Sequence, residues 1–358
     1  MLIYSEPFSP SIFLSSFSHI EIKQSILKHL NQSDTSFLEH TAFIDIETTG
    51  LSAKSSHLYL IGIIFYQNHS FYYKQWFLED PNEEKDVLKS FFTFLSNYKT
   101  IIHFNGTTFD LPYLLHKCER YCLPYTFDSY QSIDLYQLLR PLKKILKLPN
   151  CKQKSFEIAL DIDRLDRFDG GMLIEIYQEY LERKESRALH LLLLHNKEDI
   201  MHIPDLCSLI PYLDLLDASF LDTIHTQQIS ATLEKAKNLT QDTLYELHIK
   251  IDCDIYNLIF LHYRTDLFQF ITQKDSVHLL IYSSTTEFKN YYPDYKNYYY
   301  LPAEDTAIHK SVSSYVDKSH RIKATRKNCY GRFQCTEQFL SDKNALLSYT
   351  KNILKSRL

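Results

Sequence analysis

The sequence predicts an α/β protein with a larger N-terminal part and a smaller β-rich α+β domain after it. In the first part, three strand patterns follow one another in a hairpin-like run and then alternate with helical patterns. This order is typical of a mixed β-sheet flanked by helices. In the second part, apolar residues alternate with polar ones over short stretches such as 247–251 and 277–282, which indicates short strands.

The elements of the first part can be placed in order along the chain. Its strands are expected at residues 41–47, 58–66, 70–78, 100–104 and 132–135. The second and third strands form a tight hairpin, since only Gln67-Asn68-His69 lies between them. Asp80-Pro81 signals a helix start, and another helix begins near Phe109. From the last strand to about Leu216 the pattern is helical.

These patterns predict four segments in a chain of 358 residues, a length that suggests about two domains of roughly 150 residues. The expected segments are a polar lead-in with one amphipathic helix (1–40), the α/β domain (41–216), a helical or loop connection (217–235) and the small domain (236–358). The small domain is expected to close with helices near 307–317 and 336–356.

The composition bounds the class of protein. Apolar residues make up 44% and charged residues 23%, as in a globular protein with a sizeable core. The net charge of −5 excludes bulk attraction to nucleic acid, so any binding must use local patches. Seven scattered cysteines indicate reduced thiols in a cytoplasmic protein. No signal peptide is expected, and the longest apolar run, residues 58–66, falls short of the ~20 residues that span a membrane.

The sharpest chemical signal is Asp45-Ile46-Glu47, at the end of the first strand. Residues two apart on a strand point to the same side, so the two carboxylates share a face. Carboxylates side by side repel each other unless a proton is bound or a cation lies between them. A hard divalent metal with oxygen ligands satisfies this need. Taken alone, the pair could also be two solvated acids.

Two further positions strengthen the metal interpretation. Asp110 starts a helix just past a central strand, where ligand sites gather, although it could simply complement the helix N-terminus. His195 and Asp199 are four residues apart in a helical stretch and therefore share one face. An imidazole beside a metal-binding carboxylate suits the activation of a water nucleophile. The alternative is an ordinary surface pair on a helix.

Taken together and in this order, these motifs resemble those of the DEDD 3′-5′ exonuclease superfamily, which has a ribonuclease-H-like fold. The match is closer still to the YprB-like proteins and covers about residues 40–216. The supporting strings are Phe43-Ile-Asp-Ile-Glu-Thr-Thr-Gly-Leu51, Leu58-Tyr-Leu-Ile-Gly62, His103-Phe-Asn-Gly106, Phe109-Asp-Leu-Pro-Tyr-Leu114 and His195-Asn-Lys-Glu-Asp-Ile200. One departure is that His195 stands at the H-x₃-D spacing that a tyrosine usually occupies.

The resemblance implies a hydrolase that cleaves phosphodiester bonds of single-stranded DNA or RNA with two divalent cations, Mg²⁺ or Mn²⁺. The implied metal ligands are Asp45, Glu47, Asp110 and Asp199. His195 would accept the proton of the attacking water, although the unusual spacing leaves open whether it only orients that water. Thr49 and Asn105 are candidates for holding the substrate end, or else they simply form turns.

Two basic stretches are candidates for phosphate contacts. The first, which we call the basic stripe, contains no acid and comprises Arg140, Lys143, Lys144, Lys147, Lys152 and Lys154. The second lies in the small domain and comprises Lys318, Arg321, Lys323, Arg326, Lys327 and Arg332, preceded by several tyrosines. The stripe could equally be a solvated helix face, and the tyrosines either stack on bases or pack within a β domain.

Two other functions remain open at this level. One is a catalytically silent module that binds nucleic acid or a protein partner, although a silent domain would not need four carboxylates. The other is an endonuclease on the same fold. The residues do not distinguish RNA from DNA, because recognition of the 2′-hydroxyl depends on the shape of the pocket.

Overall fold

The computed structural model describes residues 1–168, 170–237, 243–253, 259–273 and 275–357. The chain divides into two compact units, Met1–Ile210 and Pro211–Leu358. The second unit thus begins before the connection expected at 217–235, and that connection already contains the start of strand β7 (Ile229–Lys237).

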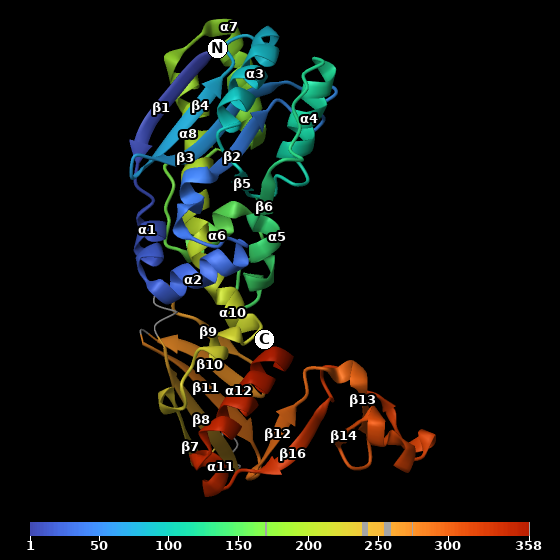
Figure 1. Ribbon diagram of the computed structural model, residues 1–358. Helices are drawn as coiled ribbons and strands as arrows, with labels where there is room; N and C mark the ends of the chain where they lie inside the picture. Colours follow the sequence, from blue (N-terminus) through green and yellow to red (C-terminus); the bar gives the residue numbers. More distant parts are fainter. Residues whose placement is uncertain (169, 238–242, 254–258, 274, 358) are drawn as a thin grey trace. The chain divides into compact units, whose positions relative to one another are not determined.

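The N-terminal unit is built on a six-stranded mixed sheet with the order β1-β4-β3-β2-β5-β6 (Figure 1). Its strands are β1 (Leu2–Phe8), β2 (Thr41–Thr48), β3 (Leu58–Gln67), β4 (Ser70–Phe77), β5 (Thr100–His103) and β6 (Gln131–Asp134). Along the row β1-β4-β3-β2 each strand is antiparallel to its neighbour, whereas β2, β5 and β6 are parallel to one another. The mixed sheet predicted from the sequence is therefore confirmed. Asn68 and His69 both have positive φ, as the tight hairpin between β3 and β4 requires.

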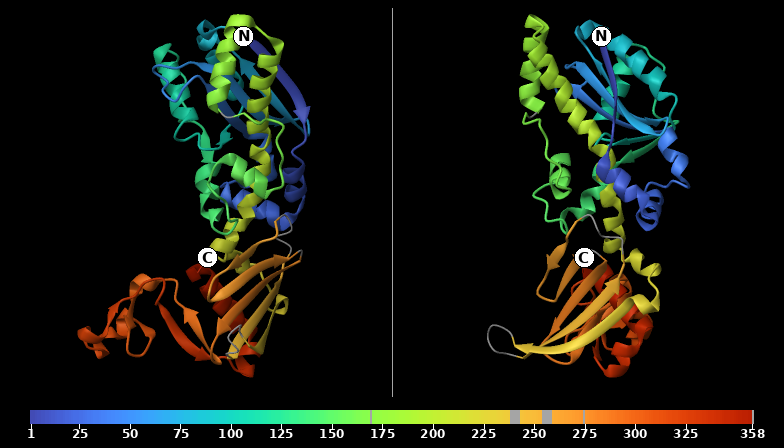
Figure 2. Two further views of the ribbon diagram at one scale, coloured as in Figure 1. Left: turned by 180° about the vertical axis from the view of Figure 1, so that it is seen from behind. Right: turned by 90° about the vertical axis from the view of Figure 1, so that its left-hand side faces the viewer.

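Helices cover both faces of this sheet (Figure 2). On one face, α3 (Glu84–Leu95) and α4 (Asp110–Arg120) bury their apolar residues against side chains such as Ile61 and Trp76. On the other face, α7 (Gly170–Arg183) and α8 (Ser186–Met201) pack against Tyr59, Leu60 and Phe77. Because β3 is buried on both faces, it reads in the sequence as a continuous apolar run.

Strand β1 was not expected, because the lead-in was predicted to carry only a helix. It pairs along its length with β4, from Leu2 opposite Phe77 to Phe8 opposite Phe71. Its side chains are mostly half-buried or exposed, and it contains Pro7. Proline is tolerated on an edge strand, where one side of the backbone needs no hydrogen-bond donor. The predicted amphipathic helix is present as α2 (Ile20–His29), preceded by α1 (Ser11–Ser18).

The helical pattern expected from the last strand to about Leu216 is interrupted, most extensively at residues 144–152 and 161–168. Short helices α5 (Leu135–Leu139) and α6 (Gln153–Ala159) come first, and α9 (Ile203–Leu206) and α10 (Leu213–Leu216) end the series. Residues 161–168, however, have no regular structure and contact α8 through side-chain hydrogen bonds. We call this segment the 161–168 loop.

The C-terminal unit is β-rich, as predicted. Its five-stranded antiparallel sheet has the order β7-β8-β11-β10-β9, with β8 (Thr243–Asp252), β9 (His262–Arg264), β10 (Phe268–Gln273) and β11 (Ser276–Ser283). Two further groups are the pair β12 (Glu287–Tyr291) and β16 (Tyr330–Gln334), and the set β13 (Tyr298–Leu301), β14 (Thr306–His309) and β15 (Ile322–Lys323). Helices α11 (Glu337–Ser341) and α12 (Lys343–Arg357) end the chain as expected.

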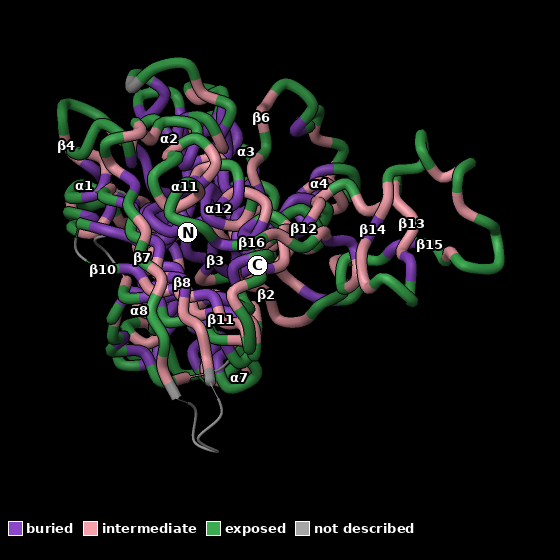
Figure 3. The backbone as a smooth tube through the Cα atoms, turned by 90° about the horizontal axis from the view of Figure 1, so that it is seen from below, coloured by how far each residue is buried: buried purple, intermediate pink, exposed green. Residues whose placement is uncertain are grey.

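The helix expected near 307–317 is absent among the described residues. Residues 306–309 instead form β14, paired with β13, and a 3₁₀ helix follows at Lys310–Tyr315. Most side chains around β13, β14 and β15 are half-buried or exposed, in contrast to the buried centre of the larger sheet (Figure 3).

Candidate metal centre

Asp45 lies in a row of residues that crosses the sheet. It is paired with Gly62 on β3, which is paired in turn with Gln75 on β4. Asn196 of α8 lies over this row, accepts a hydrogen bond from Gln75 (3.0 Å) and donates one to Asp45 Oδ2 (3.0 Å). Gly62 is required here, because a Cβ atom would lie 2.3 Å from Asn196 Oδ1. The fully buried amide therefore holds the Asp45 carboxylate in place.

Asp110 reaches the same place from the start of α4. Its side chain is only 5% exposed and accepts a hydrogen bond from the backbone N–H of Ile46, between Asp45 and Glu47 (3.1 Å). The turn that precedes it is held by Asp134 at the end of β6, which accepts hydrogen bonds from the backbone N–H groups of Asn105 (2.8 Å) and Thr107.

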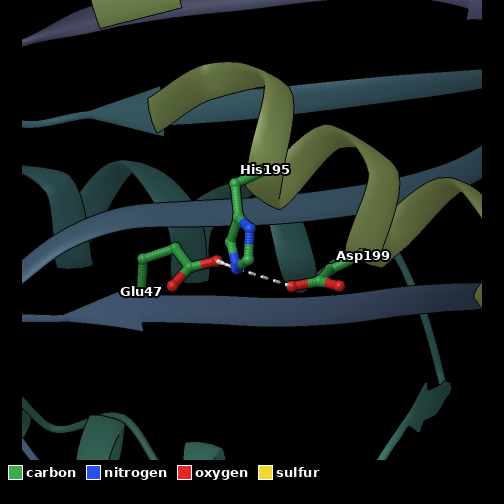
Figure 4. A group of neighbouring side chains, drawn as sticks. All are labelled: Glu47, His195 and Asp199. Atoms are coloured by element: carbon green, nitrogen blue, oxygen red, sulfur yellow. Dashed lines mark ion pairs between the residues drawn. The ribbon is translucent and has the colours of Figure 1, made fainter. Parts of the chain in front are cut away.

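His195 of α8 points into this acidic cluster (Figure 4). Its Nε2 lies 3.2 Å from Asp199 Oδ2 and 3.7 Å from Glu47 Oε1. The structure thus brings together the five residues expected at the centre, because Asp110 binds the backbone between Asp45 and Glu47, and His195 lies between Glu47 and Asp199.

The 161–168 loop supplies a residue that the sequence analysis missed. Asp166 is buried, and its Oδ2 lies 2.7 Å from Nδ1 of His195. Its backbone N–H donates a hydrogen bond to Glu198 of α8 (2.8 Å). Helix α8 therefore holds the loop in the position from which Asp166 contacts His195. A carboxylate that accepts the Nδ1 proton selects one tautomer of the ring and leaves the Nε2 lone pair free to accept a proton or bind a metal.

Arg164 of the same loop contributes a cation that contacts the cluster directly, through Asp199. Its guanidinium forms hydrogen bonds with Glu157 of α6 and with Asp199 Oδ1. Burial alone would lower the pKa of Arg164, but these two carboxylates raise it above its usual value. The guanidinium therefore stays charged and fixes the position of Asp199.

Three carboxylates of the cluster, Asp45, Glu47 and Asp110, hold protons unusually strongly. Burial raises the pKa values of Asp45 and Glu47 well above their usual range, and repulsion from Asp110 and Asp199 raises them further. Burial also raises the pKa of Asp110 to about 7, although the hydrogen bond from Ile46 opposes this. By contrast, the pKa of Asp166 is lowered: burial would raise it, but hydrogen bonds from Phe168 and His195 prevail.

This donor set fits a divalent cation. Glu47, His195 and Asp199 each offer one ligand atom, and the three atoms lie within 4.8 Å of one another. Oxygen ligands suit Mg²⁺ and Mn²⁺, and an imidazole nitrogen is compatible with transition metals. A cation would also relieve the repulsion that raises the carboxylate pKa values.

The residues expected to hold substrate fall into different surroundings. Asn105 has a positive φ and lines a surface hollow of about 440 Å³ together with Phe104, Tyr136, Cys151, Lys152 and Gln153. This places Asn105 beside one member of the basic stripe. Thr49 is instead engaged in a turn, where its hydroxyl accepts a hydrogen bond from the backbone N–H of His57 (2.8 Å).

The remaining candidates for substrate contact are the basic stripe and the tyrosines of the C-terminal unit. Every member of the basic stripe is exposed, and Lys154 forms an ion pair with Asp166 (3.2 Å). In the C-terminal unit, the tyrosines pack largely against each other and against Ala307, Ala324 and Cys329, with Tyr292 stacked on Tyr298. Packing thus accounts for most of these rings.

Residues 42–210 match a family model described as the RNase_H superfamily. The N-terminal unit has a ribonuclease-H-like fold. A comparison with curated proteins finds no matching sequence.

Solved structures similar to this chain include the family B DNA polymerase of Pyrobaculum calidifontis, at 14% identity and a TM-score of 0.41. Another is E. coli exonuclease I in complex with a dT13 oligonucleotide, at 11% identity and a TM-score of 0.33. The matches cover 49% of this chain and 25% of the polymerase, and 59% of this chain and 54% of the exonuclease. The assignment of the fold therefore rests on the family match and on the sheet. Among the described residues, no helix is both long and apolar enough to cross a membrane.

Proposed function

We propose that the ribonuclease-H-like unit is a metal-dependent 3′-5′ exonuclease of the DEDD type, related to the YprB-like proteins, that hydrolyses single-stranded nucleic acid. One observation carries the proposal: four carboxylates from β2, α4 and α8 meet at one point, and His195 Nε2 faces them. A purely structural cluster would be costly, because like charges are buried together there.

In this proposal Asp45, Glu47, Asp110 and Asp199 hold two divalent cations, Mg²⁺ or Mn²⁺. When bound, the cations supply the positive charge that favours deprotonation of water and stabilises the leaving 3′-oxygen. Asn196 and Arg164 keep Asp45 and Asp199 in position through their hydrogen bonds.

His195 is the proton acceptor in this proposal. Asp166 lies against Nδ1 of the ring, so Nε2 is the nitrogen that faces the site of reaction. A base needs to lie within about 2.6–3.2 Å of the oxygen whose proton it removes, or one water away. Since Nε2 lies 3.2 Å from Asp199 Oδ2, a water bound beside that carboxylate is within reach of the ring.

The substrate strand is proposed to cross the hollow at Asn105. Phe104 and Tyr136 offer aromatic faces there, and Lys152 offers a positive charge. Aromatic faces stack on bases without regard to sequence, and basic side chains neutralise phosphates. The exposed stripe would extend this contact along the strand.

A panel of end-labelled substrates tests the proposal. The panel contains single- and double-stranded DNA and RNA, each with Mg²⁺, with Mn²⁺ and with EDTA. We expect products that shorten stepwise from the 3′ end of single strands, with either metal and not with EDTA.

A circular single strand is the matched control, because it has no 3′ end. Its cleavage would identify an endonuclease on the same fold. Binding of every strand without cleavage would instead indicate a silent binding module, and both results would contradict the proposal.

A further inference from the structure

A pocket of about 290 Å³ lies wholly within the C-terminal unit, apart from the metal centre described above. Its apolar part is formed by the β10–β11 hairpin and α12, through Leu267, Phe268, Ile281 and Ile353. Its polar part is formed by β12, β16 and the end of α12, through Glu287, Lys289, Arg332 and Arg357. The pocket thus offers an apolar half and a cationic half.

The cations are brought together by the strand register. Lys289 on β12 is paired directly with Arg332 on β16. Like charges in such a cross-strand pair destabilise a sheet unless another charge compensates them. Arg357, in the last turn of α12, adds a third cation to the same pocket.

Two acids lie near these cations, and neither neutralises all of them. Asp305 accepts hydrogen bonds from Arg332 and from the hydroxyls of Tyr300 and Tyr330, and it lies 4.0 Å from Lys289. Glu287 lies 4.0 Å from Arg332. Burial lowers the pKa of Lys289, the charge of Asp305 opposes this, and the charges of Arg332 and Arg357 lower the pKa further. An excess of positive charge therefore remains in the pocket.

The cationic groups keep donors available. Arg357 packs over the ring of Tyr291 at 4.0 Å and donates hydrogen bonds to its hydroxyl (2.8 Å) and to the backbone carbonyl of Arg326 (3.5 Å). The Nε of Arg357 is buried and has no hydrogen-bond partner within the described part of the chain. Lys289 donates to Tyr330 (2.7 Å), and its side chain is still 37% exposed.

We propose that this pocket binds a nucleoside 5′-phosphate, with the phosphate at Lys289, Arg332 and Arg357 and the base against the apolar half. An anion is required by the charge, and a flat apolar group suits the Phe268 side of the pocket. The choice of a nucleotide over another aromatic anion rests on the proposed nuclease function. The ligand is either a free mononucleotide or the 5′-phosphorylated end of a strand.

Calorimetric titration of the full chain in EDTA tests the proposal without catalysis. The probes are a nucleoside 5′-monophosphate, the same nucleoside, inorganic phosphate, and a tetranucleotide with and without a 5′-phosphate. We expect binding of the monophosphate, of the 5′-phosphorylated tetranucleotide, or of both, which identifies the source. The nucleoside and the 5′-hydroxyl strand should bind at least about tenfold more weakly, since they lack the charge-assisted contacts.

Variants localise the binding. Lys289→Gln with Arg357→Gln should weaken it at least about tenfold, because two charge-assisted contacts are lost. Lys296→Gln with Lys310→Gln is the matched control, since it removes the same charge from exposed positions in the same unit and should change affinity by less than about twofold. Glu287→Gln should strengthen binding by about two- to fivefold, because it removes the one acid that lines the pocket.

Three results would overturn the proposal: no binding of either phosphorylated probe at millimolar concentration, equal losses in the pocket and control variants, or inorganic phosphate binding as tightly as the nucleotide. An inactive nuclease that still binds the monophosphate would refute the proposed function alone. If the double variant does not fold, the Glu287→Gln titration still decides, since unchanged or weaker binding contradicts the assignment.

Discussion

The acidic metal centre and the cationic pocket of the C-terminal unit are both gatherings of like charge, and they differ in burial. At the metal centre, Asp110 is 5% exposed, and the side chains of Glu47 and Asp199 are 13% and 21% exposed. In the C-terminal pocket, the side chains of Lys289 and Arg332 are 37% and 43% exposed. Water and salt screen the exposed group, whereas the buried carboxylates can reduce their repulsion only by binding protons or a cation.

This difference has a functional consequence. The buried acidic cluster should take up divalent cations tightly and respond little to monovalent salt. The exposed cationic pocket should bind its anion reversibly and lose affinity as salt rises.

The largest effect is expected from removing a carboxylate of the buried cluster. Asp45→Ala or Asp110→Ala should reduce nuclease turnover by about 10³–10⁵-fold, since the bound cations contribute several kcal/mol and each 1.36 kcal/mol is tenfold. Folding should survive, because the change relieves repulsion in the metal-free protein. Single-turnover rates and circular dichroism measure both effects.

Asp86→Ala is the control, because that carboxylate is 73% exposed and lies on α3. It should leave turnover unchanged. If purified Asp45→Ala protein degrades substrate as fast as the parent, the metal centre has been assigned to the wrong residues.

The next effect concerns the imidazole that faces the cluster. His195→Ala should lower turnover by about 10²–10⁴-fold, the usual cost of losing a general base, while substrate binding is retained. His195→Tyr places the residue usual for this spacing and should keep part of the activity. Turnover is measured with saturating metal, and binding is measured separately in Ca²⁺.

His190→Ala gives the matched control, because His190 is exposed on the same helix α8. Parental activity in His195→Ala would show that the cations alone activate the water, and the two histidines would then be equivalent.

A smaller loss is expected for the residue that orients the ring. Asp166→Asn should lower activity or metal affinity by about 10–100-fold, the range for partners that act through a ligand. Nitrogen NMR of His195 should show a mixture of ring tautomers in the variant and a single Nδ1-protonated form in the parent. The exposed Asp163→Asn, in the same loop, should change neither property. An unaltered tautomer in Asp166→Asn would reduce Asp166 to a packing residue.

The contrast between these residues also explains what could be predicted from the sequence. Asp45, Glu47 and Asp110 lie at the ends of regular elements, so the period of a strand and the start of a helix place each of them, and the resemblance to a family groups them into one site. Asp166 and Arg164 lie in a loop whose path depends on Glu198 and Glu157, and no local pattern indicates that path.

The role of Asn196 and the C-terminal pocket could not be predicted from the sequence for the same reason. Asn196 stands within a string that was noted in the sequence, but its role depends on the register that places Gly62 opposite Asp45. The C-terminal pocket draws Lys289, Arg332 and Arg357 from three separate segments. Only the pairing of β12 with β16 brings the first two together, and strand pairing over long sequence separations is not encoded locally.

The pH dependence of the free energy of unfolding should distinguish the buried carboxylates from the exposed cationic pocket. The folded protein holds protons on Asp45, Glu47 and Asp110 that the unfolded chain releases above pH about 4, because their pKa values are raised, that of Asp110 to about 7. The free energy of unfolding in EDTA should therefore fall as pH rises from about 4 to 7. Asp166 and Asp305 have lowered pKa values, so their protonation changes the free energy of unfolding only below this pH range.

Adding Mn²⁺ at pH 8 should restore this stability. At 100 times Kd a ligand of the folded state contributes about 2.7 kcal/mol, which is several degrees in Tm. Differential scanning calorimetry at pH 5, 6.5 and 8, with Mn²⁺ and with EDTA, measures the change. A Tm in EDTA that does not decrease with pH would contradict the raised pKa values, and Asp110→Asn should flatten the profile.

The smallest effect is expected from the exposed basic stripe. Lys143→Gln, Lys147→Gln and Lys152→Gln together should weaken strand binding modestly and make it less sensitive to salt. Each lost phosphate contact reduces the slope of log K against log salt by about 0.7 for a single strand, so the slope should change by up to about 2. Turnover at saturating substrate should be unchanged, because none of these lysines belongs to the acidic cluster.

The matched control removes Lys85, Lys89 and Lys99, which are equally exposed. Lys99 precedes β5, at the end of that strand opposite the cluster. Equal slopes in the two triple variants would mean that the stripe is solvated surface, and the strand would then have to be held at the Asn105 hollow without it.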